Sequence, residues 1–200
     1  KGICPSDKYS FFVQQYRWCL GSFSLFLNPE FWQTKLPVMV RLCYLSGMGF
    51  YIAAALGIFL TPLPGIFMVW FASDKVFWYN LIFSVPSFVY GTFGLAIWGR
   101  APWGLHALTV KHLSHWAYFF AILDKIRAKT LPWVPTGASG SQVARYKTFK
   151  ILFSLWSFGV YAAVMSGTLV HMNGWTDYNF YPIIFFSTFH TFICFLVATK

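Results

Sequence analysis

Three side chains near the start of the chain have the types and the spacing of a site for a phosphorylated sugar. Gln14, Arg17 and Trp18 stand at i, i+3 and i+4, so on a helix they project from one face. An arginine fork binds a diphosphate through two parallel hydrogen bonds, and an indole can lie flat against the C–H face of a sugar ring. A glutamine amide donates to and accepts from hydroxyl or phosphate oxygens. The pattern indicates one end of a site for a nucleotide-sugar and a saccharide acceptor.

The same residues carry a resemblance to a known family. Gln14-x-x-Arg17-Trp18 resembles the QxxRW motif of the processive family 2 glycosyltransferases, which include cellulose, hyaluronan and chitin synthases. The run from Arg41 to Leu45, and the order of elements over nearly all 200 residues, are similar to the bacterial-type cellulose synthase catalytic subunit. The resemblance implies that Arg17 contacts the diphosphate, that Trp18 supports the terminal sugar of the polymer, and that Gln14 lies beside them. The alternative is a capped surface helix whose Trp18 packs on a neighbouring domain.

The composition is that of a membrane protein. The chain is 58% hydrophobic and 22% aromatic, and only 10% of its residues are charged, whereas soluble domains carry about 25% charged residues. The net charge of +10 does not point to nucleic acid, because the basic residues gather at the ends of hydrophobic runs. The four cysteines show neither a CxxC nor a metal-ligand spacing, so we expect packing thiols and no disulfide or zinc.

Four uncharged runs predict an all-α membrane protein with four transmembrane helices. About 20 apolar residues cross the hydrocarbon core, and this condition is met by residues 42–60, 76–99, 151–172 and 178–199. Four crossings place both ends on one side. That side then holds all of the 15 basic residues except Lys75, so the positive-inside rule predicts cytoplasmic termini. We expect a multi-pass protein of the plasma (inner) membrane.

The segments between these runs complete the expected organisation. Ser6-Asp7 and Asn28-Pro29 are helix-start signals, and residues 103–127 combine an apolar stripe with a basic face suited to a membrane surface. We therefore expect a cytoplasmic QxxRW helix that ends a glycosyltransferase domain (1–27), followed by an interfacial helix (28–40) and two spans (41–100). A second interfacial helix on the cytoplasmic side (101–130), a gating loop (131–145) and two further spans (146–200) complete the chain.

A loop rich in proline, glycine and hydroxyl residues follows the second interfacial helix. It lies where cellulose synthases have a gating loop of the pattern Phe-x-Val-Thr-x-Lys. Trp133 takes the aromatic position and is followed by Val134, and Thr136 takes the threonine position, whereas Pro135 replaces the valine and Ala138 the lysine. By resemblance the loop closes over the bound diphosphate and excludes water. The alternative is a plain cytoplasmic connector.

Ser46, Phe50 and Tyr51 in the first run are candidates for lining a polymer channel. By resemblance this helix helps to form the channel, and sugar hydroxyls need protein partners inside a membrane. The alternative is that these side chains face lipid or pack between helices, as aromatic residues on spans commonly do.

The chain lacks the acidic groups that such chemistry needs. Of its five acids, Asp7 is a helix cap, Glu30 and Asp124 are expected on surface helices, and Asp74 and Asp177 are expected outside the cell. A Mg²⁺ or Mn²⁺ ion for the diphosphate and the catalytic base are therefore expected in an upstream glycosyltransferase domain that is absent from this chain. His112 and His115 stand at i, i+3, but no third metal ligand is evident beside them in the sequence, so we expect no metal site in this chain.

The sequence thus favours part of a processive, inverting β-glycan synthase. It would transfer glucose from UDP-glucose to a growing polysaccharide and extrude the polymer across the membrane. The expected partners are a UDP-sugar, the polysaccharide, membrane lipid, and accessory subunits or further copies of the chain, but not nucleic acid. Two alternatives remain: a chitin- or hyaluronan-type synthase, and a membrane transporter or scaffold without enzymatic activity. The second is weakened because the four runs contain no acid, lysine or arginine.

Overall fold

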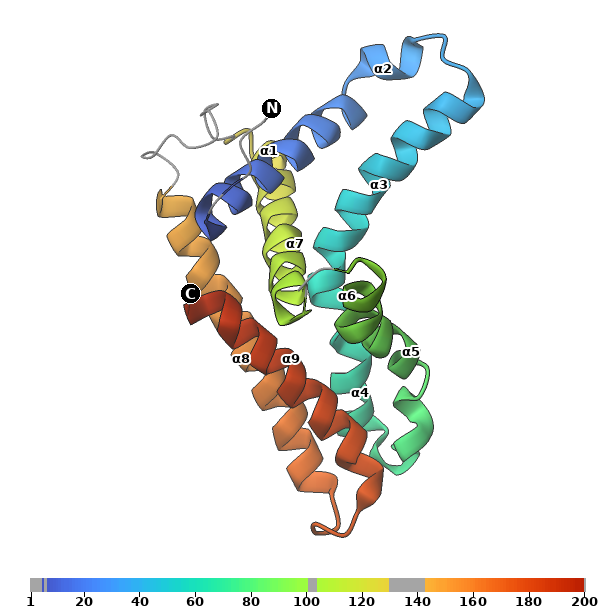
Figure 1. Cartoon of the computed structure of the whole chain (residues 1–200), viewed down its shortest axis with the longest axis vertical. Helices are drawn as coiled ribbons and strands as arrows, with labels where there is room; N and C mark the ends of the chain where they lie inside the picture. Colours follow the sequence, from blue (N-terminus) through green and yellow to red (C-terminus); the bar gives the residue numbers. More distant parts are fainter. Residues whose placement is uncertain (1–4, 6, 101–103, 130–142, 200) are drawn as a thin grey trace. The chain divides into compact units, whose positions relative to one another are not determined.

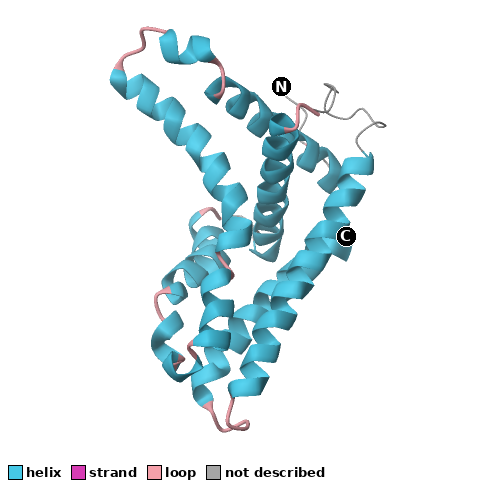
Figure 2. Cartoon of the chain, turned by 180° about the vertical axis from the view of Figure 1, so that it is seen from behind, coloured by secondary structure: helices cyan, strands magenta, loops and turns pink. Residues whose placement is uncertain are grey.

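The described part of the chain is predominantly helical (Figure 1). The computed structural model describes all residues except 1–4, 6, 101–103, 130–142 and 200. None of the described residues lies in a strand, as Figure 2 shows. The helices are α1 (Lys8–Phe26), α2 (Pro29–Gln33), α3 (Val38–Leu60), α4 (Leu63–Phe71), η1 (Ser73–Lys75), η2 (Trp78–Leu81), α5 (Ser84–Val89), η3 (Tyr90–Gly94), α6 (Leu95–Trp98), α7 (Gly104–Ile126), α8 (Val143–His171), η4 (Tyr178–Phe180) and α9 (Tyr181–Thr199).

The two predicted helix starts are confirmed, and each is made by a local cap. The Asp7 carboxylate accepts hydrogen bonds of 2.8 Å from the backbone N–H and from the hydroxyl of Ser10. These bonds stabilise the charged form, the one from the Ser10 backbone most strongly, and lower the pKa of Asp7. The Asn28 side chain accepts from the Glu30 N–H at 3.0 Å, with Pro29 in the first helical position.

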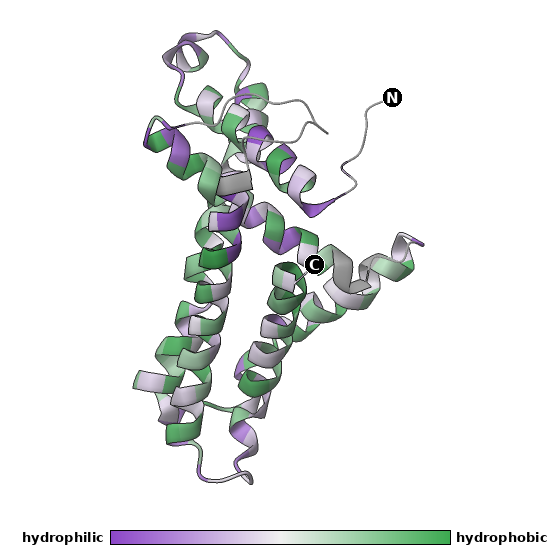
Figure 3. Ribbon diagram, turned by 90° about the vertical axis from the view of Figure 1, so that its left-hand side faces the viewer, coloured by the Kyte–Doolittle hydropathy of each residue, from purple (hydrophilic) through white to green (hydrophobic). Residues whose placement is uncertain are grey.

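Three of the predicted spans correspond to helices that are long and apolar enough to cross a membrane. By length and composition these are the stretches Val38–Phe71, Arg145–His171 and Tyr178–Thr199 of the described chain. Figure 3 shows hydrophobic residues along most of the length of the long helices. In such helices the backbone N–H and C=O groups hydrogen-bond to one another, as a segment surrounded by lipid requires.

The run 76–99 does not form the single long helix that its lack of charge predicts. It is divided into η2, α5, the π-helical η3 and α6. Pro86 lies in the first turn of α5, where its ring excludes a helical hydrogen bond to Ile82, so the helix cannot extend far toward the N-terminus. The continuous helical part, residues 84–98, is only about 22 Å long. The prediction of four continuous transmembrane helices is therefore not confirmed.

The segment 28–40 also differs from the expected single helix. It contains the five-residue α2, an extended stretch, and the beginning of α3 at Val38. Leu36 precedes Pro37, and the residue before a proline is disfavoured in the helical conformation.

The described chain divides into two compact units. Unit 1 comprises Lys1–Phe59 and Leu113–Phe149, and unit 2 comprises Leu60–His112 and Lys150–Lys200. In unit 1 a cluster of aromatic rings from three helices is buried, with Phe12 of α1 packed on Phe120 of α7 and Phe149 of α8 at centroid distances of 6.4 and 5.0 Å. This cluster fixes the orientation of α1 about its own axis.

The core of unit 2 is aliphatic and aromatic, and one contact in it is unusually close. Val69, Val164, Phe180 and Ile183 are buried together with Val76. Gly167 of α8 meets α4 so closely that a β-carbon there would stand 2.7 Å from a methyl of Val69 and 2.9 Å from the indole nitrogen of Trp70. Small residues allow such approaches between helices in membranes. Residues 150–171 of α8 and the following α9 run side by side in opposite directions (Figures 1 and 2).

Candidate functional site

The two faces of α1 have different environments within unit 1. Gln15 and Tyr16 are buried on the inner face, together with Phe12 and Cys19. Gln14, Arg17 and Trp18 form the outer face of α1: Gln14 and Arg17 are half-buried, and Trp18 is 55% exposed. The three residues therefore lie on one face of a helix, as their spacing predicts, and their role in binding remains a prediction.

A buried polar network holds the inner face of α1 to α7. The Tyr16 hydroxyl donates to the Asp124 carboxylate at 3.1 Å, and the Tyr118 hydroxyl donates to the Gln15 side-chain oxygen at 2.8 Å. Asp124 is also paired with Arg145 at the beginning of α8. Because Asp124 is only 1% exposed, its carboxylate needs these partners to offset the cost of burial.

The burial of Asp124 corrects the expectation that it lies on the surface of an interfacial helix. Ala117, Phe120, Ala121 and Asp124 share one side of α7, and all four are buried. Arg145 also lies over the ring of Phe120, 5.4 Å from its centroid. The available signal in the sequence was that Asp124 continues the apolar stripe of its helix at i, i+4 from Phe120.

Burial also affects the titratable groups next to this network. The thiol of Cys19 lies 3.7 Å from the backbone oxygen of Tyr118, and burial raises the pKa of Cys19 to about 12. Burial raises the pKa of Tyr118 as well. Both groups are therefore protonated at neutral pH, and neither is a nucleophile or a base in this state.

A hollow of about 700 Å³ lies between α1 and α3 in unit 1. It is lined from α1 by Gly21, Ser22 and Leu25, and from α3 by Val40, Cys43, Tyr44, Gly47, Met48, Phe50 and Tyr51. Ser22 and Leu25 stand one and two turns beyond Trp18 on the same side of α1. Two of the three predicted channel residues, Phe50 and Tyr51, thus line a hollow that continues from the outer face of α1, while Ser46 is exposed on α3.

The predicted gating-loop residues Trp133, Val134 and Thr136 lie outside the described residues. The helices on either side are described: α7 ends at Ile126 and α8 begins at Val143. The ion pair between Asp124 and Arg145 joins these two helix ends. The two helix ends that flank these residues are therefore held together by the same carboxylate that accepts from Tyr16.

The acids of unit 1 offer no base beside the outer face of α1. Asp7 is engaged as the cap of α1, and Asp124 is held by Tyr16 and Arg145 on the inner side. Glu30 lies in the first turn of α2 and is exposed. The expectation that the Mg²⁺ or Mn²⁺ ligands and the base lie upstream remains a prediction.

Comparisons with protein-family models, with curated proteins and with solved structures find no match for this chain. What the structure establishes is the class: a helical chain with three described helices that could cross a membrane. The resemblance to glycosyltransferases rests on the residues of the QxxRW pattern and the segments that follow it.

Proposed function

We propose that this chain is the QxxRW helix and membrane part of a processive β-glycan synthase. It acts with an upstream glycosyltransferase domain to transfer glucose from UDP-glucose to a growing polysaccharide and to pass the polymer through the membrane. The observation that carries the proposal is the exposure of Trp18 on the outer face of α1. Its indole is more than half exposed, although the opposite face of the same helix is fully packed.

The chemistry of this face fits a sugar diphosphate and an acceptor sugar. Arg17 supplies a fixed positive charge with paired donors for the diphosphate. Trp18 supplies a flat apolar surface for the terminal sugar ring, and Gln14, one turn before Trp18, supplies donor and acceptor groups between them. Mg²⁺ or Mn²⁺ held by the upstream domain completes the site.

The hollow between α1 and α3 supports a path for the product. Its aromatic lining from Tyr44, Phe50 and Tyr51 suits the apolar faces of sugar rings. Ser22 adds a hydroxyl for hydrogen bonding. Because the hollow begins one turn beyond Trp18, an acceptor seated on the indole would extend into it.

We further propose that residues 76–99 form the fourth crossing as an interrupted helix. In unit 2 the backbone N–H of Trp78 lies 3.3 Å from the Asn179 side-chain oxygen, to which it donates. Further along, Phe88 packs on Phe185, Phe186 and Phe189 of α9, with a shortest centroid distance of 5.0 Å. The segment therefore follows the candidate span 178–199 in the same direction, which favours a shared depth in the bilayer and termini on one side.

The proposal is tested with Trp18→Ala in the complete native polypeptide that contains this chain. In membrane vesicles supplied with UDP-glucose, the variant should lose polymer elongation and retain UDP binding, because the indole seats the acceptor and not the nucleotide. Trp32→Ala is the matched control, since Trp32 is also an exposed tryptophan of unit 1 and should not affect elongation. Unchanged polymer yield in Trp18→Ala would remove Trp18 from the mechanism. Replacing UDP-glucose by UDP-N-acetylglucosamine identifies a chitin-type synthase.

A further inference from the structure

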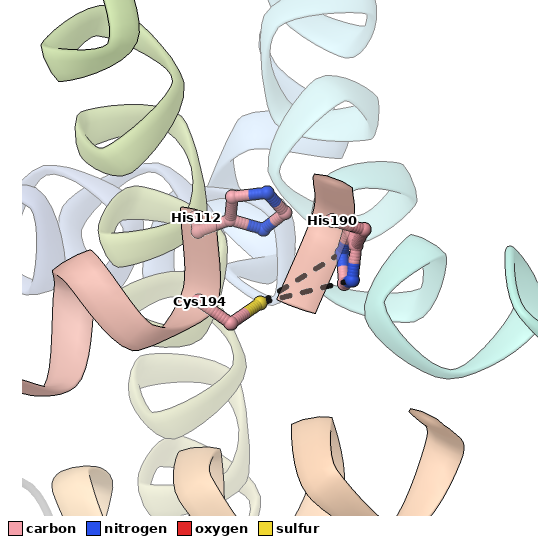
Figure 4. A group of neighbouring side chains, drawn as sticks. All are labelled: His112, His190 and Cys194. Atoms are coloured by element: carbon pink, nitrogen blue, oxygen red, sulfur yellow. Dashed lines mark hydrogen bonds between the residues drawn. The ribbon is translucent and has the colours of Figure 1, made fainter. Parts of the chain in front are cut away.

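A group of three potential metal ligands lies within unit 2, and none of them belongs to the proposed glycosyltransferase site. His112 comes from α7, and His190 and Cys194 come from α9; their ligand atoms all lie within 4.8 Å of one another. Figure 4 shows the three side chains pointing toward one another. The Cys194 sulfur is 3.7 Å from Nδ1 and 3.9 Å from Nε2 of His190. The rings of His112 and His190 are 4.9 Å apart, centre to centre.

The fold makes this arrangement, not a local sequence motif. His190 and Cys194 are separated by one helical turn and so lie on one face of α9. His112 precedes them by more than 70 residues and is brought to them by the packing of unit 2. In the sequence, His112 has only His115 as a nearby ligand, which is why no third ligand was expected.

The environment of the cluster favours a function over simple packing. His190 and Cys194 lie inside the candidate span Tyr178–Thr199, and ionisable side chains within membrane spans are costly and usually mark a functional site. Cys194 is 3% exposed, whereas the His190 residue is exposed. The thiol is thus held inside the unit, with the imidazole of His190 beside it.

We propose that His112, His190 and Cys194 form a Zn²⁺-binding site. Two imidazoles and one thiolate are ligands that Zn²⁺ accepts, whereas Mg²⁺ and Ca²⁺ require oxygen ligands. In a tetrahedral zinc site, sulfur and nitrogen ligands stand about 3.6 Å apart, close to the separation of Cys194 from His190. Two nitrogen ligands stand about 3.3 Å apart, a distance that rotation of the two imidazole side chains can reach.

Three protein ligands leave the fourth position of the ion for water or an external ligand. This is the coordination of an open zinc site, not of a closed structural one. Binding replaces the thiol proton of Cys194, which is released to solvent as the thiolate coordinates the metal. No change in oxidation state is involved.

The test is metal binding by the purified chain in detergent. After removal of metals with a chelator, the chain should bind one Zn²⁺, measured by elemental analysis. With Co²⁺ as the probe, it should show the near-ultraviolet charge-transfer band of a thiolate ligand. Cys194→Ser should abolish this band, and His112→Gln and His190→Gln should each weaken Zn²⁺ binding by at least about 100-fold, beyond the loss caused by removing an outer-shell partner.

Cys43→Ser and His171→Gln are the matched controls, because Cys43 is an exposed thiol of α3 and His171 is a histidine of unit 2 outside the cluster. Both should bind like the unmodified chain. A second measurement needs no variant: Zn²⁺ should slow the alkylation of Cys194 by a membrane-permeable maleimide and leave the alkylation of Cys43 unchanged. Any of three results would overturn the proposal. They are the absence of stoichiometric binding, Co²⁺ binding without the thiolate band, and alkylation of Cys194 at the same rate with and without Zn²⁺.

Discussion

The interiors of the two units are stabilised in different ways. Unit 1 buries a carboxylate, Asp124, and satisfies it with a hydroxyl and a guanidinium. Unit 2 buries an apolar cluster and brings α4 and α8 into close contact at Gly167. The first arrangement specifies orientation, because a buried charge tolerates only one set of partners. The second specifies distance, because a close contact tolerates only a small side chain.

Among the substitutions that test this difference between the units, removing the charge of Asp124 is expected to have the largest effect on stability. Asp124→Asn leaves Arg145, a quarter of whose side chain is exposed, without a counter-charge in a largely buried position. We expect unit 1 to lose about 3 kcal/mol of its free energy of unfolding, measured by denaturant titration in detergent. Asp74→Asn is the control, because Asp74 and its partner Lys75 are both mostly exposed and such pairs contribute little. Equal effects of the two substitutions would contradict the assigned role of Asp124.

Adding one methyl group at Gly167 tests the close contact in unit 2. Gly167→Ala places a β-carbon 2.7 Å from the Val69 side chain, which is fully buried. It also crowds Trp70, whose indole N–H donates to the backbone oxygen of Ala163 at 2.8 Å. We expect a loss of about 2 kcal/mol from overpacking, read from the thermal unfolding of the chain. The matched control is Gly159→Ala, two turns earlier on α8, where nothing lies within 4 Å of the new β-carbon. A loss of the same size in Gly159→Ala would show that α8 is destabilised by any glycine-to-alanine change, and that the contact with α4 is not the cause.

Substitutions on the two faces of α1 are expected to have the smallest effects on the free energy of unfolding. Tyr16→Phe removes one hydrogen bond to Asp124 and leaves the pair with Arg145 intact, so we expect a cost of about 1 kcal/mol. Trp18→Ala on the outer face should change the free energy of unfolding by no more than about 0.5 kcal/mol, although it is the change expected to stop elongation. If Trp18→Ala proved the more destabilising of the two, the indole would be a packing residue, and its activity phenotype would lose its meaning.

The parts of the fold that depend on neighbouring residues could be predicted from the sequence. The caps at Asp7 and Asn28 act within three residues of their own positions, and both were confirmed. The three described helices that could cross a membrane were predicted from local hydropathy alone. The run 76–99 was predicted wrongly as a continuous helix, because the lack of charge does not reveal the break that Pro86 imposes near the start of α5.

The contacts that join distant residues could not be predicted in this way. Tyr16 and Asp124 are 108 residues apart, and Gln15 and Tyr118 are 103 residues apart. Periodicity places each of these residues on a helix face but does not reveal which face meets which. The outer face of α1 was predictable because its three residues are neighbours on a single helix, whereas the network that orients this face had to be seen in the structure.

The pair between Asp124 and Arg145 has a consequence for how the connection between α7 and α8 can vary. The pair joins two residues that are 21 positions apart in the sequence, and the entropy lost in closing a chain segment grows only with the logarithm of its length. Doubling the connection would cost about 0.6 kcal/mol. We therefore expect insertions between Asp124 and Arg145 to change the free energy of unfolding of unit 1 only slightly.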